Sequence, residues 1–418
     1  MGTAFLFCLP YHGHINPCVP VVQELIRRGE RVVIYTTEEF RPMLASIGAE
    51  FREFPYEESN KGSTLLTMAY WQLQVTSRSM DMLVRHARAY HVTYILVDYL
   101  CHWGHTLAKH LSLPLVVLHS TYPAAFRDVS LFRSVMLDLQ KAPYLLPRLL
   151  RFILLDRRLA RHWGVMPLRL PIGLVRRREG GIHIVLTSEW IQPQATLGQH
   201  PYHFVGSCVR RQGTTQGERL PALDGRPLIY ISLGTFWNDK PDFYRTCAQV
   251  FGNGPYQVLI SVGSAVLTAG LGPLPQNIHI RGHVDQIEAL EHASLFISHG
   301  GMNSLCEAVQ ARVPLLLLPQ AGDQFPLSEL MQQKGVGIVL QPGTVSADTL
   351  RAAAERALRD GSIKAKMTQL RSMTAAHGDP GRRAADLIFE LLLTADRAGN
   401  NSPPHRAGHD GTLTSAGA

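Results

Sequence analysis

Short apolar runs alternate with amphipathic stretches along this chain, and that alternation restricts the possible folds more than any other feature. In the first half, the runs predict strands at Ala4–Leu9, Arg31–Thr36, Tyr94–Val97, Leu115–His119 and His183–Thr187. In the second half, they predict strands at Leu228–Ser232, Gln257–Ser261, His279–Arg281, Leu295–Ser298 and Pro314–Pro319. Strands that alternate with helices are typical of parallel sheets. We therefore expect an α/β protein with two doubly wound, Rossmann-like sheets in succession.

The pattern starts again after a segment rich in turn-forming residues. Gly206–Pro227 contains four glycines and two prolines, which is typical of a linker. A chain of 418 residues also exceeds the size at which a single core keeps growing. We predict an N-terminal domain at 1–205, a linker at 206–227 and a C-terminal domain at 228–379, with the two domains facing each other across a cleft. The small, polar residues 399–418 predict a disordered tail.

Composition argues against several classes of protein. The six cysteines have no paired spacing, which argues against a zinc ribbon or a disulfide framework and predicts a cytoplasmic protein. No run reaches the roughly 18 uncharged apolar residues of a transmembrane helix. The net charge is +8 and arginines are dense from Arg148 to Arg178, so weak contact with a membrane surface stays open beside a plain solvated helix face. No aromatic interleaving accompanies these arginines, so we expect no nucleic-acid partner.

The stretch Leu295–Val309 is the most informative part of the sequence. A buried strand runs into two glycines and then a helix, whose first N–H groups favour an anion. Asn303 and Ser304 fall in the first helical turn, where they can cap the helix or donate to phosphate oxygens. His299 can place a donor on the same phosphate, and Glu307 can reach a ribose hydroxyl. A plain strand-to-helix turn remains the alternative.

Three further stretches share the features of a nucleotide site. Ile229–Thr235 ends a strand in a glycine with flanking hydroxyls, Gly282–Gln286 precedes a short helix, and Leu315–Gln324 ends a strand in a polar loop. The chain has neither a phosphate-binding P-loop nor a dinucleotide GxGxxG after its first strand. It also has no Asp-x-Asp sequence, the usual ligand pair for a metal-bridged diphosphate. We therefore expect a nucleotide site that uses no metal and no resident cofactor.

These four stretches, in this order and spacing, resemble the donor-binding half of the inverting nucleotide-sugar glycosyltransferases. The likeness is to the macrolide and natural-product branch, which is related to the plant and microbial UDP-glycosyltransferases. It extends to Gly378–Asp386, which is similar to that family's final helix, expected here at about 380–398 and packing back on the N-terminal domain. The resemblance implies the GT-B fold, with an acceptor-binding N-terminal domain and a donor-binding C-terminal domain.

The resemblance also implies roles for individual residues. Those of the donor site are Thr235, His299, Gly301, Asn303 and Ser304 at the pyrophosphate, Gln286 and Glu307 at the ribose, Asp323 and Gln324 at the transferred sugar, and His283 with Val284 at the base. The family usually has a tryptophan where this chain has His283. Imidazole offers less stacking area, so the choice between uridine and thymidine stays open.

Two histidines straddle a glycine in Tyr11–Asn16, just after the first predicted strand. Transfer to an alcohol needs a general base, and neutral histidine suits that task. The resemblance implies that the base is His14 and its partner Asp98, which we expect to meet because their strands are neighbours. A metal pair with a third ligand from His102, His105 or His110 and a plain polar turn are the alternatives. His12 receives no firm role.

We therefore expect an inverting hexosyltransferase. His14 deprotonates a hydroxyl of an apolar small molecule, such as a macrolide or polyphenol, which attacks a UDP-sugar, with glucose as the expected sugar. The residues expected to line the acceptor site are Met68, Trp71, Tyr122 and Phe126. A dTDP-deoxysugar-dependent enzyme, a sugar-nucleotide epimerase and an inactive binding protein are the alternatives. We expect a monomer or a homodimer.

Overall fold

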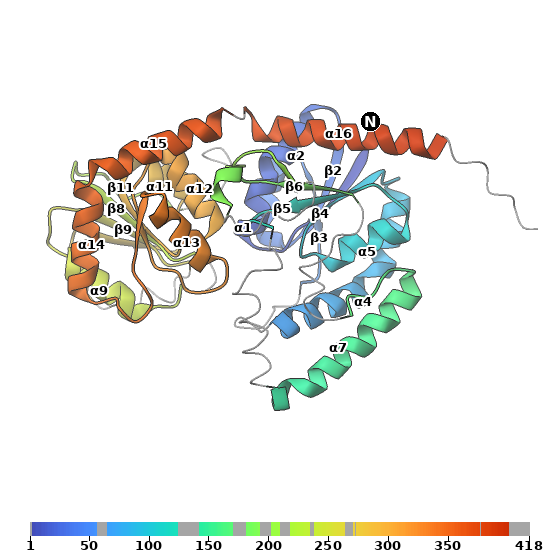
Figure 1. The fold of residues 1–418 in the computed structure, drawn as a ribbon, viewed down its shortest axis with the longest axis horizontal. Coiled ribbons are helices and arrows are strands. Elements are labelled where there is room, and N and C mark those ends of the chain that lie inside the picture. The colour runs from blue at the N-terminus through green and yellow to red at the C-terminus, as the bar shows by residue number, and fades with distance from the viewer. Residues whose placement is uncertain are drawn as a thin grey trace, which may run out of the picture.

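The computed structural model describes residues 2–56, 65–123, 142–169, 181–192, 202–209, 218–234, 238–263, 271, 273–376 and 378–400. It contains two separate sheets, each wholly parallel and each flanked by helices (Figure 1). The first sheet has seven strands in the order β3-β2-β1-β4-β5-β6-β7. Their bounds are β1 Thr3–Phe7, β2 Arg31–Thr36, β3 Glu50–Glu53, β4 Tyr94–Asp98, β5 Leu115–His119, β6 Ile182–Val185 and β7 Tyr202–Phe204.

The second sheet has six strands in the order β10-β9-β8-β11-β12-β13. Their bounds are β8 Leu228–Ser232, β9 Gln257–Ser261, β10 Ile278–Arg281, β11 Ala293–Ser298, β12 Leu315–Leu317 and β13 Gly337–Val339. In both sheets the strand order reverses beside the first strand of the sheet, which places a topological switch point there. The prediction of two doubly wound parallel sheets is confirmed.

All of the strands expected from the sequence are present; four have the expected bounds and the ends of the others are shifted by at most two residues. Three short strands at the sheet edges, β3, β7 and β13, were not expected. Each has only three or four residues, too few to show a period.

Helices cover both faces of the two sheets. In the N-terminal part they are α1 His12–Ile15, α2 Val19–Arg27, α3 Arg41–Ser46, α4 Leu65–Ala89, α5 His102–His110 and α7 Ala142–Trp163, with 3₁₀ turns at Asn16–Cys18, Glu38–Phe40 and Glu189–Ile191. In the C-terminal part they are α9 Pro241–Phe251, α11 Gln286–His292, α12 Met302–Ala311, α13 Gln324–Gln333, α14 Ala347–Arg359, α15 Gly361–Ala375 and α16 Pro380–Asn400. Among the helices of the described residues, none is long and apolar enough to span a membrane.

The last helix, α16, crosses back to the first sheet and lies along α2 (Figure 1). Its Ala384, Ala385 and Ile388 are fully buried in the same apolar cluster as the buried face of α2. At its edge, Arg28, the residue directly after α2, pairs with Asp386 at 2.6 Å. The helix begins at Pro380, and the sequence predicts a final helix at about 380–398. The helix continues to Asn400, so the first two residues of the expected tail are helical and the rest of the tail lies outside the described residues.

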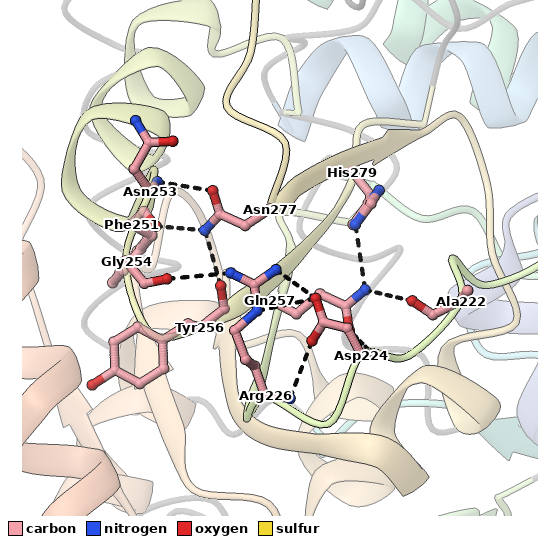
Figure 2. Close-up of polar contacts among 10 residues, drawn as sticks. All are labelled: Ala222, Asp224, Arg226, Phe251, Asn253, Gly254, Tyr256, Gln257, Asn277 and His279. Carbon is pink, nitrogen blue, oxygen red and sulfur yellow. Dashed lines mark hydrogen bonds and ion pairs between the residues drawn. The ribbon is translucent and has the colours of Figure 1, made fainter.

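A cluster of polar contacts lies at the amino ends of β8, β9 and β10 in the second sheet (Figure 2). The loops at the carboxyl ends of these strands, where ligands of such sheets bind, lie at the opposite end. The Asn277 side-chain amide donates to the carbonyls of Phe251 and Tyr256, at 2.8 and 2.9 Å. Beside it, the Gln257 amide donates to the carbonyl of Ala222 at 2.8 Å, which ties the end of the predicted linker to β9. These contacts satisfy buried polar groups and stabilise the sheet.

Candidate functional site

The structure brings His14 and Asp98 together. Asp98 is the last residue of β4, while His14 lies on the short helix α1 that follows β1, the neighbouring strand. His14 Nδ1 lies 2.7 Å from Asp98 Oδ2, and the side chains are 20% and 1% exposed. The other Asp98 oxygen accepts a hydrogen bond from the backbone of Leu100 at 3.0 Å. The carboxylate therefore has a fixed orientation and the imidazole keeps one accessible edge.

The surroundings of His14 raise its pKa above the ordinary value. Burial alone would lower it, but the negative charge of Asp98 and the hydrogen bond to it outweigh burial. The charge of Asp323, which comes from the other half of the chain, raises the pKa further. A histidine with a raised pKa is a stronger base, and a buried carboxylate stabilises the imidazolium that forms.

Sequence reasoning missed a third residue at this point, Ser120. It follows β5, which pairs with β4, so its hydroxyl lies beside both partners. Ser120 Oγ is 3.2 Å from His14 Nδ1 and donates to Asp98 Oδ2 at 3.4 Å. A polar residue directly after a buried strand next to β4 was the available signal.

The turn after β11 leads into the N-terminus of α12. The N-cap residue, Gly301, provides no side-chain cap, so the first N–H groups of the helix remain available for an anion. His299 lies against this turn. A Cβ atom on Gly301 would come within 2.5 Å of its ring, and one on Gly234 within 2.7 Å. Only glycine fits at these two positions.

Burial lowers the pKa of His299 to about 4. The ring is therefore neutral at pH 7 and can offer one hydrogen bond but no positive charge. Its Nδ1 has no hydrogen-bond partner among the residues described. Desolvation disfavours the imidazolium, but a neutral ring can still place the expected donor on a phosphate.

Three residues expected at the ribose or the phosphate meet one another. The Gln286 amide donates to Glu307 Oε2 at 2.5 Å and to Ser304 Oγ at 3.1 Å. Its oxygen accepts from the hydroxyl of Tyr230 at 3.3 Å. Gln286 begins α11, whereas Ser304 and Glu307 lie on α12, so the network joins the two helices and fixes the Glu307 carboxylate.

Other donor-side residues contact the N-terminal domain. The Asn303 amide donates to the carbonyl of Gly13 at 2.8 Å, and the hydroxyl of Thr121 donates to Asp323 at 2.9 Å. The ring of His283 stacks on that of His12, with centroids 5.3 Å apart and planes at 17°. We call these three contacts the cross-domain contacts. They place the histidine loop directly against the donor-side residues.

The remaining donor-side predictions have different outcomes. Gln324 Oε1 accepts from the backbone of Gln320 and Ala321, at 2.8 and 3.1 Å, and so closes its own loop. Val284 is 2% exposed in the apolar core, so its side chain is not available to a ligand. Thr235 lies outside the described residues.

Comparison with known proteins shows similarity to glycosyltransferases. Residues 243–389 match the C-terminal domain of the erythromycin biosynthesis protein CIII-like family. The chain is 26% identical to the uncharacterized UDP-glucosyltransferase YojK of Bacillus subtilis over 96% of this chain and 100% of that protein. It is 27% identical to the demethyllactenocin mycarosyltransferase of Streptomyces fradiae over 94% of this chain and 87% of that protein.

The fold agrees with these sequence matches. The crystal structure of the glycotransferase of kitacinnamycin superposes with a TM-score of 0.79 at 25% identity, covering 94% of this chain and 99% of that one. The chain is a glycosyltransferase of the GT-B fold, and it is similar over its length to natural-product glycosyltransferases.

In this glycosyltransferase, the residues expected to line the acceptor site lie in different apolar clusters. Met68 and Trp71 of α4 pack against the apolar cluster under the first sheet, where Trp71 stacks on Tyr56 with centroids 6.3 Å apart. Tyr122 is instead 4% exposed in an apolar cluster of the second sheet, so the expected role in an acceptor wall does not fit its position. Phe126 lies outside the described residues.

The histidines weighed as metal ligands have other partners in the glycosyltransferase. His102 Nδ1 lies 3.2 Å from the hydroxyl of Thr76 and 3.0 Å from that of Thr106, and His110 Nδ1 is 3.1 Å from the carbonyl of Trp163. Within the described ranges, no three histidine, cysteine or acidic side chains gather as a metal site.

Proposed function

We propose that this glycosyltransferase moves a hexose from a UDP-sugar to a hydroxyl of an apolar small molecule, with inversion at the sugar carbon. The observation that carries the proposal is the position of the His14–Asp98 pair. It lies at the ends of adjacent strands, and the loop that holds His14 contacts the donor-side turn through Gly13 and Asn303. A general base and an anion-binding helix end are thus neighbours, as a displacement at an activated sugar requires.

The proposed mechanism follows from the hydrogen bonds. Donation from His14 Nδ1 to Asp98 leaves Nε2 to accept the proton of the acceptor hydroxyl as its oxygen attacks C1. The bond from C1 to the diphosphate breaks on the opposite face, so an α-linked donor gives a β-linked product. The N–H groups at the start of α12 and the neutral His299 ring stabilise the leaving diphosphate.

The two domains divide the substrates in this proposal. Residues 1–205 hold the acceptor, with Met68 and Trp71 near its site, and residues 228–379 hold the donor. The two relatives point to different donor sugars, because one is named a UDP-glucosyltransferase and the other a mycarosyltransferase. UDP-glucose is our first choice, and a dTDP-deoxysugar is the alternative because His283 replaces the usual tryptophan. Cytoplasmic location, weak membrane contact and oligomeric state stay predictions.

A screen of donors against acceptors tests the proposal. We expect a mass gain of one hexose when the protein is given UDP-glucose and a polyphenol or macrolide, and a β-anomeric product by proton NMR. The donor panel should include dTDP-activated deoxysugars. An α-linked product would overturn inversion, and conversion of the free nucleotide sugar to an epimer would favour the epimerase alternative.

The pH profile provides a separate prediction. His14 must be neutral to accept a proton, so kcat/KM should fall as pH drops through its pKa, with a midpoint above 6.5. In Asp98→Asn the raising charge and its hydrogen bond are lost while burial remains, so the midpoint should move to lower pH. Initial rates from pH 5 to 9 at subsaturating acceptor measure both midpoints. An identical midpoint in the two proteins would contradict this assignment.

A further inference from the structure

Three consecutive residues of the loop Tyr11–His14 each contact a residue from a different element. His12 stacks on His283, Gly13 accepts from Asn303, and His14 pairs with Asp98. The first two partners belong to the C-terminal domain and the third to the N-terminal domain. His12, to which the sequence assigned no firm role, is therefore the residue of this loop that lies against the base-proximal part of the donor side.

The rings of His12 and His283 stack directly on each other, and we call the site between these two ring faces the slot. Their planes differ by 17°, so both faces are nearly parallel, and their centroids are 5.3 Å apart. His12 also meets Phe40 edge-on, with centroids 5.0 Å apart and planes at 63°. Phe40 is buried, so it gives the His12 ring a fixed apolar contact.

The slot lies in line with the other donor-side residues. His283 is three residues before Gln286, which joins the Glu307 network, and Glu307 lies one turn beyond the anion-binding start of α12. A nucleoside diphosphate with its diphosphate at α12 and its ribose near Glu307 extends its base toward His283. The order of base, ribose and diphosphate matches the order of these residues.

We propose that His12 and His283 form a two-sided clamp for the nucleotide base, with one imidazole from each domain. A flat ring needs about 3.5 Å on each face, so a base between them requires roughly 7 Å between the two rings. The two rings are in stacking contact, with centroids 5.3 Å apart, which leaves no room for a base, so the base must separate the rings on entry. The proposal rests on the proposed function and makes His12 a positioning residue for the donor, supplied by the acceptor-binding domain.

Isothermal titration with UDP, with dTDP and with inorganic pyrophosphate tests the clamp. We expect His12→Ala to bind both nucleotides roughly tenfold more weakly, because stacking on one face of the base is lost. Pyrophosphate, which has no base, should bind the variant and the wild type alike. His12→Phe keeps a stacking face and should stay within about threefold of the wild type. His292→Ala, at the exposed end of α11, is the matched control.

Kinetics and a double-variant cycle complete the test. His12→Ala should raise the KM for the nucleotide sugar with little change in kcat at saturating donor. Its effect should shrink when His283 is also alanine, because the two faces act on one ligand. Unchanged or tighter nucleotide binding in His12→Ala would overturn the clamp, and so would equal losses with pyrophosphate. If the wild type binds neither nucleotide, the proposed function fails instead.

Discussion

Replacing His14 by alanine should lower kcat for transfer to an alcohol by about 10²–10⁴-fold, the usual contribution of a positioned general base. Asp98 is buried behind His14 and cannot reach the acceptor in its place. The dissociation constant for UDP should change little, because His14 itself makes no contact with the α12 turn in the cross-domain contacts. Product formation followed by mass spectrometry and nucleotide titration measure the two effects separately.

A second acceptor sharpens this prediction. A thiol acceptor ionises near pH 8.5, so at that pH much of it needs no base. The loss in His14→Ala should therefore be much smaller with the thiol than with the matching alcohol. The variant His162→Ala, at the exposed end of α7, is the control for a histidine far from the pair. An alcohol transfer rate equal to that of the wild type would refute the role of His14.

Asp98→Asn should reduce kcat by a comparable factor, about 10²–10⁴-fold, for a different reason. The amide oxygen of asparagine can still accept the hydrogen bond from the backbone N–H of Leu100, so this local contact is kept. Its NH₂ group can donate to His14 Nδ1, so the imidazole proton moves to Nε2. Nε2 can then no longer accept the proton of the substrate hydroxyl. Steady-state rates at saturating substrates, with circular dichroism as the folding check, measure the effect.

Ser120→Ala is the matched comparison for Asp98→Asn. Its hydroxyl also approaches His14 Nδ1, at 3.2 Å, but it carries no charge. We expect a loss of less than about tenfold, because the Asp98 carboxylate still fixes the tautomer. A larger loss in Ser120→Ala than in Asp98→Asn would show that the serine, and not the aspartate, orients the base.

The family resemblance implied the roles of His14 and Asp98, and strand order predicted that the two side chains would meet. Asp98 ends β4 and His14 follows β1, and adjacent parallel strands place their carboxyl ends together. The helix position of Glu307 predicted its reach to a ribose, whereas Gln286 was assigned there by the resemblance and its contact with Glu307 was not predicted. Such local periodicities are visible in the sequence.

The contacts between domains could not be predicted in this way. The stacking of His12 on His283, and the bond from Thr121 to Asp323, join residues more than 200 positions apart with no shared period. The relative placement of two domains depends on whole surfaces rather than on any one motif. For the same reason Tyr122, expected at an acceptor, lies in a core cluster of the second sheet.

The chain passes between the two domains twice, once before β8 and once between α15 and α16 (Figure 1). We expect these two crossings to favour one relative motion of the domains, a rotation about the line that joins the crossings. All three cross-domain contacts would then form or break during the same rotation. Stopped-flow measurements of nucleotide binding should accordingly show one concerted closing phase. The rate of the reverse rotation, which opens the domains, would set an upper limit on the turnover rate.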